Sequence, residues 1–174
     1  KAPGDRYDNW AEFALDLARA GRLSKFDQSI TDSEKFMALK SRPILTELDD
    51  SEIWEFVHAG KWSRLPAYTT LVREGELGDS LFLLAEGEAK VTLQGRLLNV
   101  LGNGEWFGEQ PYVSGAAVQR QATVETTADA VIAEYPLAAL DSLGERCQKK
   151  FSRALLRTRS DRLALSNVRI SRMN

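Results

Sequence analysis

The chain has 174 residues, of which 43% are hydrophobic and 28% are charged, and its formal net charge is −2. This length allows one well-buried domain with additional helices, and the composition excludes the disordered and fibrous classes. Apolar runs such as Leu81–Ala85 are much shorter than a bilayer span, so we expect no membrane partner. The chain does not open with a charged and then apolar leader, and the single Cys147 excludes an internal disulfide. These features favour a cytoplasmic location.

Residues 1–42 predict a helical extension followed by a linker. Apolar side chains recur at the spacing of one helical face between residues 7 and 20. Polar residues dominate the following stretch, where the sequence from Thr31 to Glu34 is a capping box for a short helix at 32–39. We therefore place a domain boundary at this linker and assign residues 43–174 to the main domain.

The main domain is predicted to be an α+β fold, with a helix at 50–59 whose start is capped by Asp50 or Ser51. Short runs rich in β-branched and aromatic residues, separated by glycines, then predict an antiparallel, jelly-roll-like β-roll, with a tight turn at Gly95-Arg96. Helices return near the C-terminus, so the roll is flanked by helices on both sides. The predicted strands are 69–73, 80–85, 89–93, 97–101, 121–125 and 130–135, and the last helices are 137–143 and 145–168.

The charge is unevenly distributed along the chain. Residues 146–174 carry nine basic side chains and one acid, Asp161, which gives this segment a charge of +8 and leaves −10 for the remainder. Such a basic segment is compatible with nucleic-acid binding or with a solvated helical face packed on an acidic partner surface. We favour the second interpretation.

The segment from Gly104 to Val124 carries the chemistry. It places a glycine-acid pair, Gly108-Glu109, eleven residues before Arg120. A cyclic phosphodiester joined to a ribose needs a cation for its phosphate, and a guanidinium can hold it with two hydrogen bonds. The free ribose hydroxyl needs an acceptor, which a carboxylate beside a glycine supplies.

These residues resemble a known family. The sequence Phe107-Gly-Glu followed by a short helix and by Arg120-Gln-Ala-Thr-Val is similar to the phosphate-binding cassette of cyclic-nucleotide-binding domains. Such domains occur in catabolite activator proteins, in regulatory subunits of cyclic-AMP-dependent kinase and in gated channels. The glycine-turned strand pair at 73–87 has a similar counterpart in the family. The resemblance covers roughly residues 44–167.

The resemblance implies a role for each residue of the motif. Arg120 would pair with the cyclic phosphate, and Glu109 with the ribose 2′-hydroxyl. Phe107, Gly108 and Ala122 would line the site, the last two with close backbone contacts, and the long C-terminal helix would cover the base. Gln121 stands where the family often has a small residue or a hydroxyl that helps to select the base. The expected ligand is a cyclic nucleotide, with cyclic AMP favoured because it is the commoner ligand of the family, and no cofactor or metal is expected.

One departure from the family pattern supports an alternative. Two positions after the glutamate, members usually carry a small residue whose N–H donates to the phosphate, but this chain has Pro111, which has no N–H. In the alternative, Glu109 and Arg120 form a structural ion pair in a degenerate roll that serves dimerisation or docking without a ligand.

The effector is suggested by a second, shorter resemblance. Residues 5–17 are similar to the final helix of bacterial serine/threonine kinase catalytic domains, although a generic amphipathic helix explains them equally well. We expect a covalently linked kinase domain as a partner, and a homodimer through the C-terminal helix. Only about seven residues follow Asn167, too few for a helix-turn-helix domain, so we expect no DNA partner.

An enzyme within these residues is not expected, because paired carboxylates, a glycine-rich nucleotide loop and a serine elbow are all missing. The single histidine, His58, is interpreted as a surface or edge residue, and Cys147 as a core residue. Trp106, beside the motif, is interpreted as a packing residue rather than a platform for a base.

Overall fold

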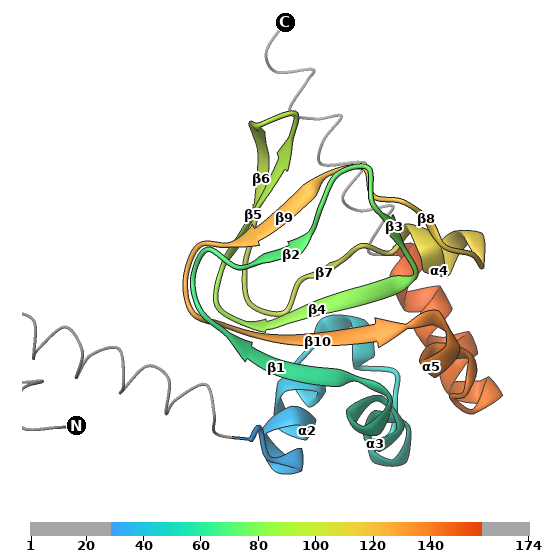
Figure 1. Ribbon diagram of the computed structural model, residues 1–174. Coiled ribbons are helices and arrows are strands. Elements are labelled where there is room, and N and C mark those ends of the chain that lie inside the picture. Colours follow the sequence, from blue (N-terminus) through green and yellow to red (C-terminus); the bar gives the residue numbers. More distant parts are fainter. Residues whose placement is uncertain (1–28, 158–174) are drawn as a thin grey trace, which may run out of the picture. The chain divides into compact units, whose positions relative to one another are not determined.

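In the computed structural model, the described part of the chain is residues 29–157 (Figure 1). The chain divides into two compact units at Ile30/Thr31, and the second unit contains nearly all of the described residues. The predicted helix at 7–20, the kinase-like segment at 5–17 and the end of the long C-terminal helix lie outside the described residues. The predicted domain boundary at residue 42 stays a prediction.

Within residues 29–157, ten strands form an antiparallel roll built from two four-stranded sheets and a two-stranded ribbon. One sheet has the order β1-β10-β4-β7, the other β2-β9-β5-β6, and β3 pairs with β8 (Figure 1). The α+β prediction is thereby confirmed. The strands are β1 (Lys61–Leu65), β2 (Thr70–Val72), β3 (Leu77–Gly78), β4 (Ser80–Glu86), β5 (Ala89–Leu93), β6 (Arg96–Leu101), β7 (Trp106–Phe107), β8 (Val118–Gln119), β9 (Thr123–Thr126) and β10 (Ala130–Pro136).

The central strand β4 is buried on both faces, which explains its continuous apolar sequence. Phe82 and Leu84 point into the core between the sheets, where they meet Val72, Val124 and Ile132. Because successive side chains of a strand alternate, the odd-numbered side chains of β4 face the opposite side, which the helices cover. Leu81, Leu83 and Ala85 are fully buried there.

Except for α4 (Gln110–Ser114), which lies beside β8, the helices gather on the outer face of the sheet that contains β1, β10 and β4 (Figure 1). The predicted capping box of α2 (Asp32–Lys40) is confirmed. The Thr31 side chain accepts from the Glu34 N–H, and the Glu34 side chain accepts from the Thr31 N–H. The next helix, α3 (Asp50–Ala59), has the predicted bounds, but its N-cap is Asp49 rather than Asp50 or Ser51, and Asp49 forms a second capping box with Glu52. The helices are α2 (Asp32–Lys40), the 3-10 turn η1 (Pro43–Leu45), α3 (Asp50–Ala59), α4 (Gln110–Ser114), α5 (Leu137–Asp141) and a C-terminal helix that starts at 145.

The six predicted strands are all present, with ends that shift by at most two residues. The predicted turn at Gly95-Arg96 is wrong by one position. Gln94 and Gly95 form the turn, with φ values of 50° and 76°, and β6 begins at Arg96. Two positive φ angles are typical of the turn that matches the twist of a two-residue hairpin, and glycine takes the second position readily.

The C-terminal helix packs against α3 through ion pairs. Lys150 Nζ lies 2.6 Å from a carboxylate oxygen of Glu52, which is buried, and Arg146 lies 3.3 Å from the other oxygen. Arg157 pairs with Glu47 at 2.5 Å. The basic segment is expected to pack on an acidic partner surface. In the described part of that segment, acidic residues of the chain itself provide this surface.

Of the helices that the structure describes, none has the length and apolar character needed to cross a membrane.

Candidate functional site

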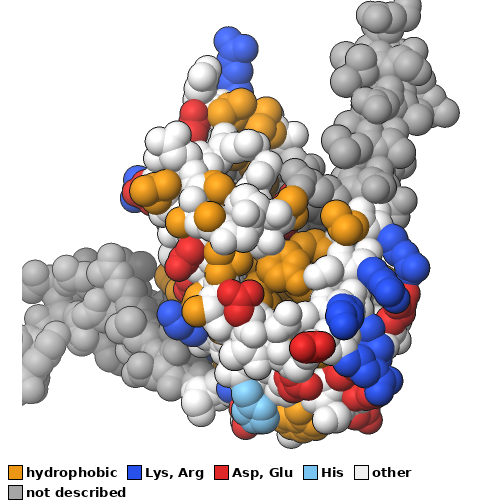
Figure 2. All heavy atoms as spheres, turned by 90° about the vertical axis from the view of Figure 1, so that its right-hand side faces the viewer, with side chains coloured by type: hydrophobic (Ala, Val, Ile, Leu, Met, Phe, Trp, Pro, Cys, Tyr) orange, Lys and Arg blue, Asp and Glu red, His pale blue; other side chains and the backbone are white. Residues whose placement is uncertain are grey.

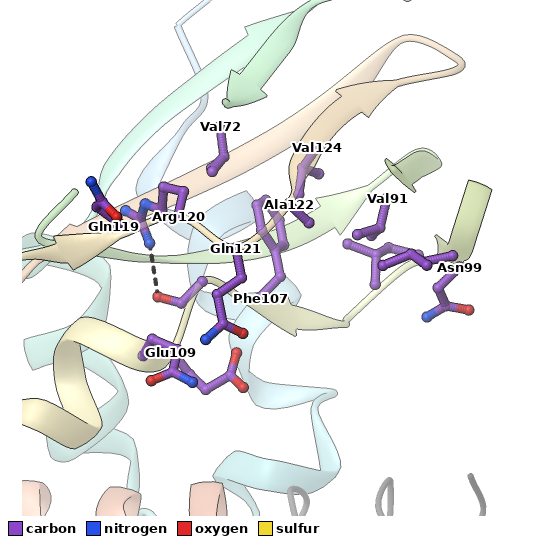
Figure 3. Close-up of a pocket in the computed structure, with 14 residues that line it drawn as sticks. Val72, Val91, Asn99, Phe107, Glu109, Gln119, Arg120, Gln121, Ala122 and Val124 are labelled. Carbon is purple, nitrogen blue, oxygen red and sulfur yellow. Dashed lines mark hydrogen bonds between the residues drawn. The ribbon is translucent and has the colours of Figure 1, made fainter. Parts of the chain in front are cut away.

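A cavity of about 340 Å³ opens beside α4, and all six residues that the sequence motif singled out line it (Figure 3). Its walls come from both sheets, from the start of α4 and from the segment that joins β8 to β9. The lining residues are Val72, Val91, Leu98, Asn99, Leu101, Phe107, Gly108, Glu109, Gln110, Gln119, Arg120, Gln121, Ala122 and Val124.

The Arg120 side chain is fixed at one end of this cavity by backbone carbonyls. Its Nη1 donates to the Gly108 oxygen at 3.1 Å and its Nη2 to the Ser80 oxygen at 2.8 Å. The guanidinium also lies over the Phe82 ring, 5.6 Å from its centroid. A guanidinium carries five N–H donors, so three remain beyond these two bonds. Arg120 therefore retains the capacity to bind an anion.

The electrostatic surroundings of Arg120 act in two directions. Burial lowers the pKa of the guanidinium, because a desolvated charge is less stable, and the carboxylates of Asp79 and Glu134 oppose this effect. Arginine stays charged in proteins despite such shifts. Asp79 and Glu134 do not line the cavity, so at this end the cavity is lined by the Arg120 cation and not by those carboxylates.

Glu109 lies on another wall of the cavity, at the N-cap of α4. Figure 3 shows Glu109 below Gln121, with Arg120 toward one end and Asn99 toward the other. The structure thus brings the predicted carboxylate and guanidinium to one open space. Pro111 is buried in the first turn of α4, a position that tolerates proline because its N–H has no partner within the helix.

The floor of the cavity is apolar. Val72, Val124 and Phe107 reach it from the core, and the Phe107 ring stacks on Phe82 with centroids 5.2 Å apart. The cavity has a cation at one end, a carboxylate at its side and an apolar floor. Such a lining suits a flat, partly apolar molecule that has an anionic group and a hydroxyl group.

The sequence motif missed three amide side chains that line the same cavity, Asn99, Gln110 and Gln119. Asn99 lies on β6, outside the motif, and its place follows only from the pairing of β5 with β6. Gln110 could have been found, because it follows Glu109 directly at the start of the predicted helix.

The other residues considered from the sequence lie outside the cavity. His58 stacks on Trp54 with ring centroids 5.8 Å apart, and Cys147 is buried, where burial raises the pKa of its thiol to about 12. Trp106 packs against Phe56 and Phe151 between the roll and the helices, so its predicted packing role is confirmed. Among residues 29–157, no three side chains of the metal-binding types gather as a metal site would require.

Comparisons with known proteins point to one family. Residues 62–147 match the model of the cyclic nucleotide-binding domain. The chain is 31% identical over 88 residues to cGMP-dependent protein kinase, isozyme 1, of Drosophila melanogaster, covering 50% of this chain and 12% of that protein. It is 35% identical over 88 residues to the cAMP-dependent protein kinase regulatory subunit of Yarrowia lipolytica, covering 49% of this chain and 23% of that protein. The match thus spans less than a quarter of either relative.

A solved structure supports the same fold. The crystal structure of a cyclic nucleotide-binding domain from Methylobacillus flagellatus superposes with a TM-score of 0.70 at 20% identity, covering 82% of this chain and 84% of that chain. The motif from Phe107 to Val124 lies within the matched residues, and the roll around it agrees with the fold of this structure. The chain therefore belongs, through residues 62–147, to the cyclic nucleotide-binding domain family and is homologous to regulatory parts of cyclic-nucleotide-dependent protein kinases.

Proposed function

We propose that this domain binds a cyclic nucleotide in the cavity beside α4, with cyclic AMP favoured over cyclic GMP, and that its C-terminal helix transmits binding to an attached effector such as a kinase. One observation carries the proposal: Arg120, Glu109 and an apolar floor line a single cavity of about 340 Å³. Small-molecule sites usually have volumes of about 300–1,000 Å³. The role is regulatory rather than catalytic, and we propose a cytoplasmic location.

In the proposed complex, the remaining donors of Arg120 pair with the cyclic phosphate, and Glu109 accepts a hydrogen bond from the ribose 2′-hydroxyl. Phe107, Gly108 and Ala122 contact the ligand from the floor and the adjacent backbone. Gln121 presents both a donor and an acceptor, so its amide is compatible with either purine. The preference for cyclic AMP rests on its frequency in the family.

A second candidate function is a roll that serves dimerisation or docking, through the C-terminal helix, without a ligand. Two observations favour it. Two N–H groups of Arg120 are already bound by the Gly108 and Ser80 carbonyls, and Pro111 offers no backbone donor beside Glu109. Both features reduce the number of donors available to a phosphate.

Calorimetric titration of the 174-residue chain with cyclic AMP, cyclic GMP and non-cyclic AMP separates the two candidates. Arg120→Ala is expected to cost about 2–5 kcal/mol of binding, or at least about 30-fold in Kd, because it removes the charge partner of the phosphate. Arg96→Ala is the control, since Arg96 is exposed on β6 and does not line the cavity. Equal affinity of the Arg120→Ala variant and the wild type would eliminate the proposed site.

Pro111→Ala provides the complementary test. It restores a backbone N–H beside Glu109, and a hydrogen bond to a charged group contributes about 1.5–3 kcal/mol. If the wild type binds no cyclic nucleotide and Pro111→Ala gains binding, the cavity is degenerate in this chain and the docking function is the better one.

A further inference from the structure

A hydrogen bond joins α4 to the C-terminal helix. The hydroxyl of Tyr112 on α4 lies 2.7 Å from Oγ of Ser152 on the C-terminal helix, and the Tyr112 ring packs edge-on against Phe151 with centroids 5.5 Å apart. Both Tyr112 and Ser152 are half-buried. The pair is therefore a polar contact beside the Tyr112–Phe151 ring contact.

The direction of this hydrogen bond follows from the other bond of Ser152. Its Oγ lies 2.8 Å from the Gln148 carbonyl oxygen, one helical turn earlier, and only the serine hydroxyl can donate there. A serine hydroxyl has one proton, so Ser152 accepts from Tyr112. The phenol proton of Tyr112 thus connects α4, through Ser152, to the backbone of the C-terminal helix.

The other end of α4 reaches the cavity. Glu109 is the N-cap of α4, Gln110 is its first residue, and both line the cavity. The Val113 N–H donates to the Glu109 oxygen at 3.1 Å, so the short helix is closed by its own hydrogen bond between the cavity and Tyr112. Glu109, which lines the cavity, and Tyr112, which contacts the C-terminal helix, therefore lie on one hydrogen-bonded turn of chain.

We propose that Tyr112 is a positioning residue, whose hydrogen bond to Ser152 couples the cavity wall at Glu109 to the C-terminal helix. The coupling itself can be tested without a ligand, and its response to ligand rests on the function proposed above. By linkage, if ligand binding changes the position of the C-terminal helix, then weakening the connection between α4 and that helix changes ligand affinity.

Hydrogen exchange of the ligand-free, full chain tests the coupling. Tyr112→Phe removes the phenol oxygen and keeps the ring against Phe151. We expect it to accelerate amide exchange in both 110–114 and 145–157, by about 3–10-fold, the range for loss of one net hydrogen bond. In a Ser152→Ala background the same change should have no further effect, because its acceptor is already gone.

Tyr68→Phe and Ser142→Ala are matched controls. Tyr68 is 77% exposed on a turn, and Ser142 makes the same kind of bond as Ser152, to the Ala139 carbonyl, away from α4. Acceleration in only one of the two segments, or an equal effect of Tyr112→Phe with and without Ser152, would overturn the coupling.

Titration with cyclic AMP then tests the ligand-dependent part. In the wild type, cyclic AMP should slow amide exchange at 145–157. In Tyr112→Phe this response should be lost, although exchange in the strands that line the cavity should still slow. The Kd of the variant for cyclic AMP should rise by about 3–10-fold. An unchanged response at 145–157 would overturn the positioning role. If the wild type binds neither cyclic AMP nor cyclic GMP, the proposed function fails. Hydrogen exchange measured without ligand still decides whether the coupling exists.

Discussion

At the scale of single residues, the position of the Arg120 guanidinium depends on the glycine at position 78. A Cβ atom there would lie 2.2 Å from Nε of Arg120 and 2.6 Å from its Cζ. Gly78 lies on β3, next to the strand that leads into Arg120, and its backbone does not need a positive φ. The glycine is therefore required for space and not for backbone freedom.

Gly78→Ala is expected to displace the guanidinium rather than to unfold the roll, because the crowded atoms belong to the end of a flexible side chain. The bonds to Ser80 and Gly108 should be lost, and the affinity for cyclic AMP should fall at least about tenfold, as expected for loss of a charge-assisted bond. Calorimetry measures the affinity for cyclic AMP, and a thermal melt measures whether the roll stays folded. Gly102→Ala is the control, since its Cβ would make only an ordinary contact, 4.0 Å from Glu105. A Gly78→Ala variant with wild-type affinity would contradict this account.

The sequence was informative about the site wherever its residues are contiguous. Phe107, Gly108 and Glu109 form one run, and Arg120, Gln121 and Ala122 another, so one motif placed both at the cavity. Asn99 could not be found in this way, because it reaches the cavity only through the pairing of β6 with β5, whereas Gln119 directly precedes Arg120 and could have been found like Gln110. The carbonyl partners of Arg120 were equally inaccessible, because a backbone atom leaves no signature in the sequence.

At the scale of elements, the buried carboxylate of Glu52 connects α3 to the C-terminal helix. It accepts from the Asp49 N–H at 2.9 Å, completing the capping box of α3, and pairs with Lys150 and Arg146. Ion pairs are stronger where they are shielded from water, and only 7% of the Glu52 side chain is exposed. One side chain therefore supports both the start of α3 and the docking of the C-terminal helix.

Glu52→Gln is expected to destabilise the chain by about 1.5–3 kcal/mol, the range for hydrogen bonds to charged groups, because Lys150 loses its shielded partner. Urea unfolding measures the change in the free energy of unfolding. Glu145→Gln serves as the control, since Glu145 pairs with Lys149 on the exposed side of the same helix, and such surface pairs contribute little. Similar losses for both variants would show that the buried pair has no special role.

The strands that the sequence predicted are those with a run of at least three residues rich in Leu, Val, Thr or aromatic side chains. The two-residue strands β3, β7 and β8 were missed because two residues cannot show a period. Strand β1 was missed for another reason: it carries Lys61, Ser63 and Arg64, and it is a strand because it pairs with β10 along its whole length. Here a tertiary contact outweighed the local composition.

At the scale of the whole molecule, the capping boxes make the stability of the fold depend on pH. The backbone N–H of Glu52 lowers the pKa of Asp49, and the backbone N–H of Thr31 lowers that of Glu34. A carboxylate whose pKa is lower in the folded state stabilises the fold above its unfolded pKa of about 4, and this contribution is lost as the pH falls through the folded pKa.

We therefore expect the Tm of the chain to fall as the pH is lowered from about 5 to about 3. Asp49→Asn should flatten this dependence, because asparagine is an equally good N-cap but does not titrate. Thermal melts across the pH series measure the effect, with Asp141→Asn, an exposed aspartate outside the N-caps, as the control. A pH dependence of Asp49→Asn that parallels the wild type would argue against this origin.

The aromatic cluster between the roll and the helices gives the molecule an intrinsic optical reporter. Trp106 is 4% exposed, and its ring lies 5.3 Å from that of Phe151 on the C-terminal helix. Indole emission shifts to longer wavelength when water reaches the ring, so separation of this helix from the roll should appear directly in the fluorescence of the unlabelled chain. The other three tryptophans, Trp10, Trp54 and Trp62, would contribute background emission. Movement of the helix can thus be followed in real time, without a dye that would disturb the surface being observed.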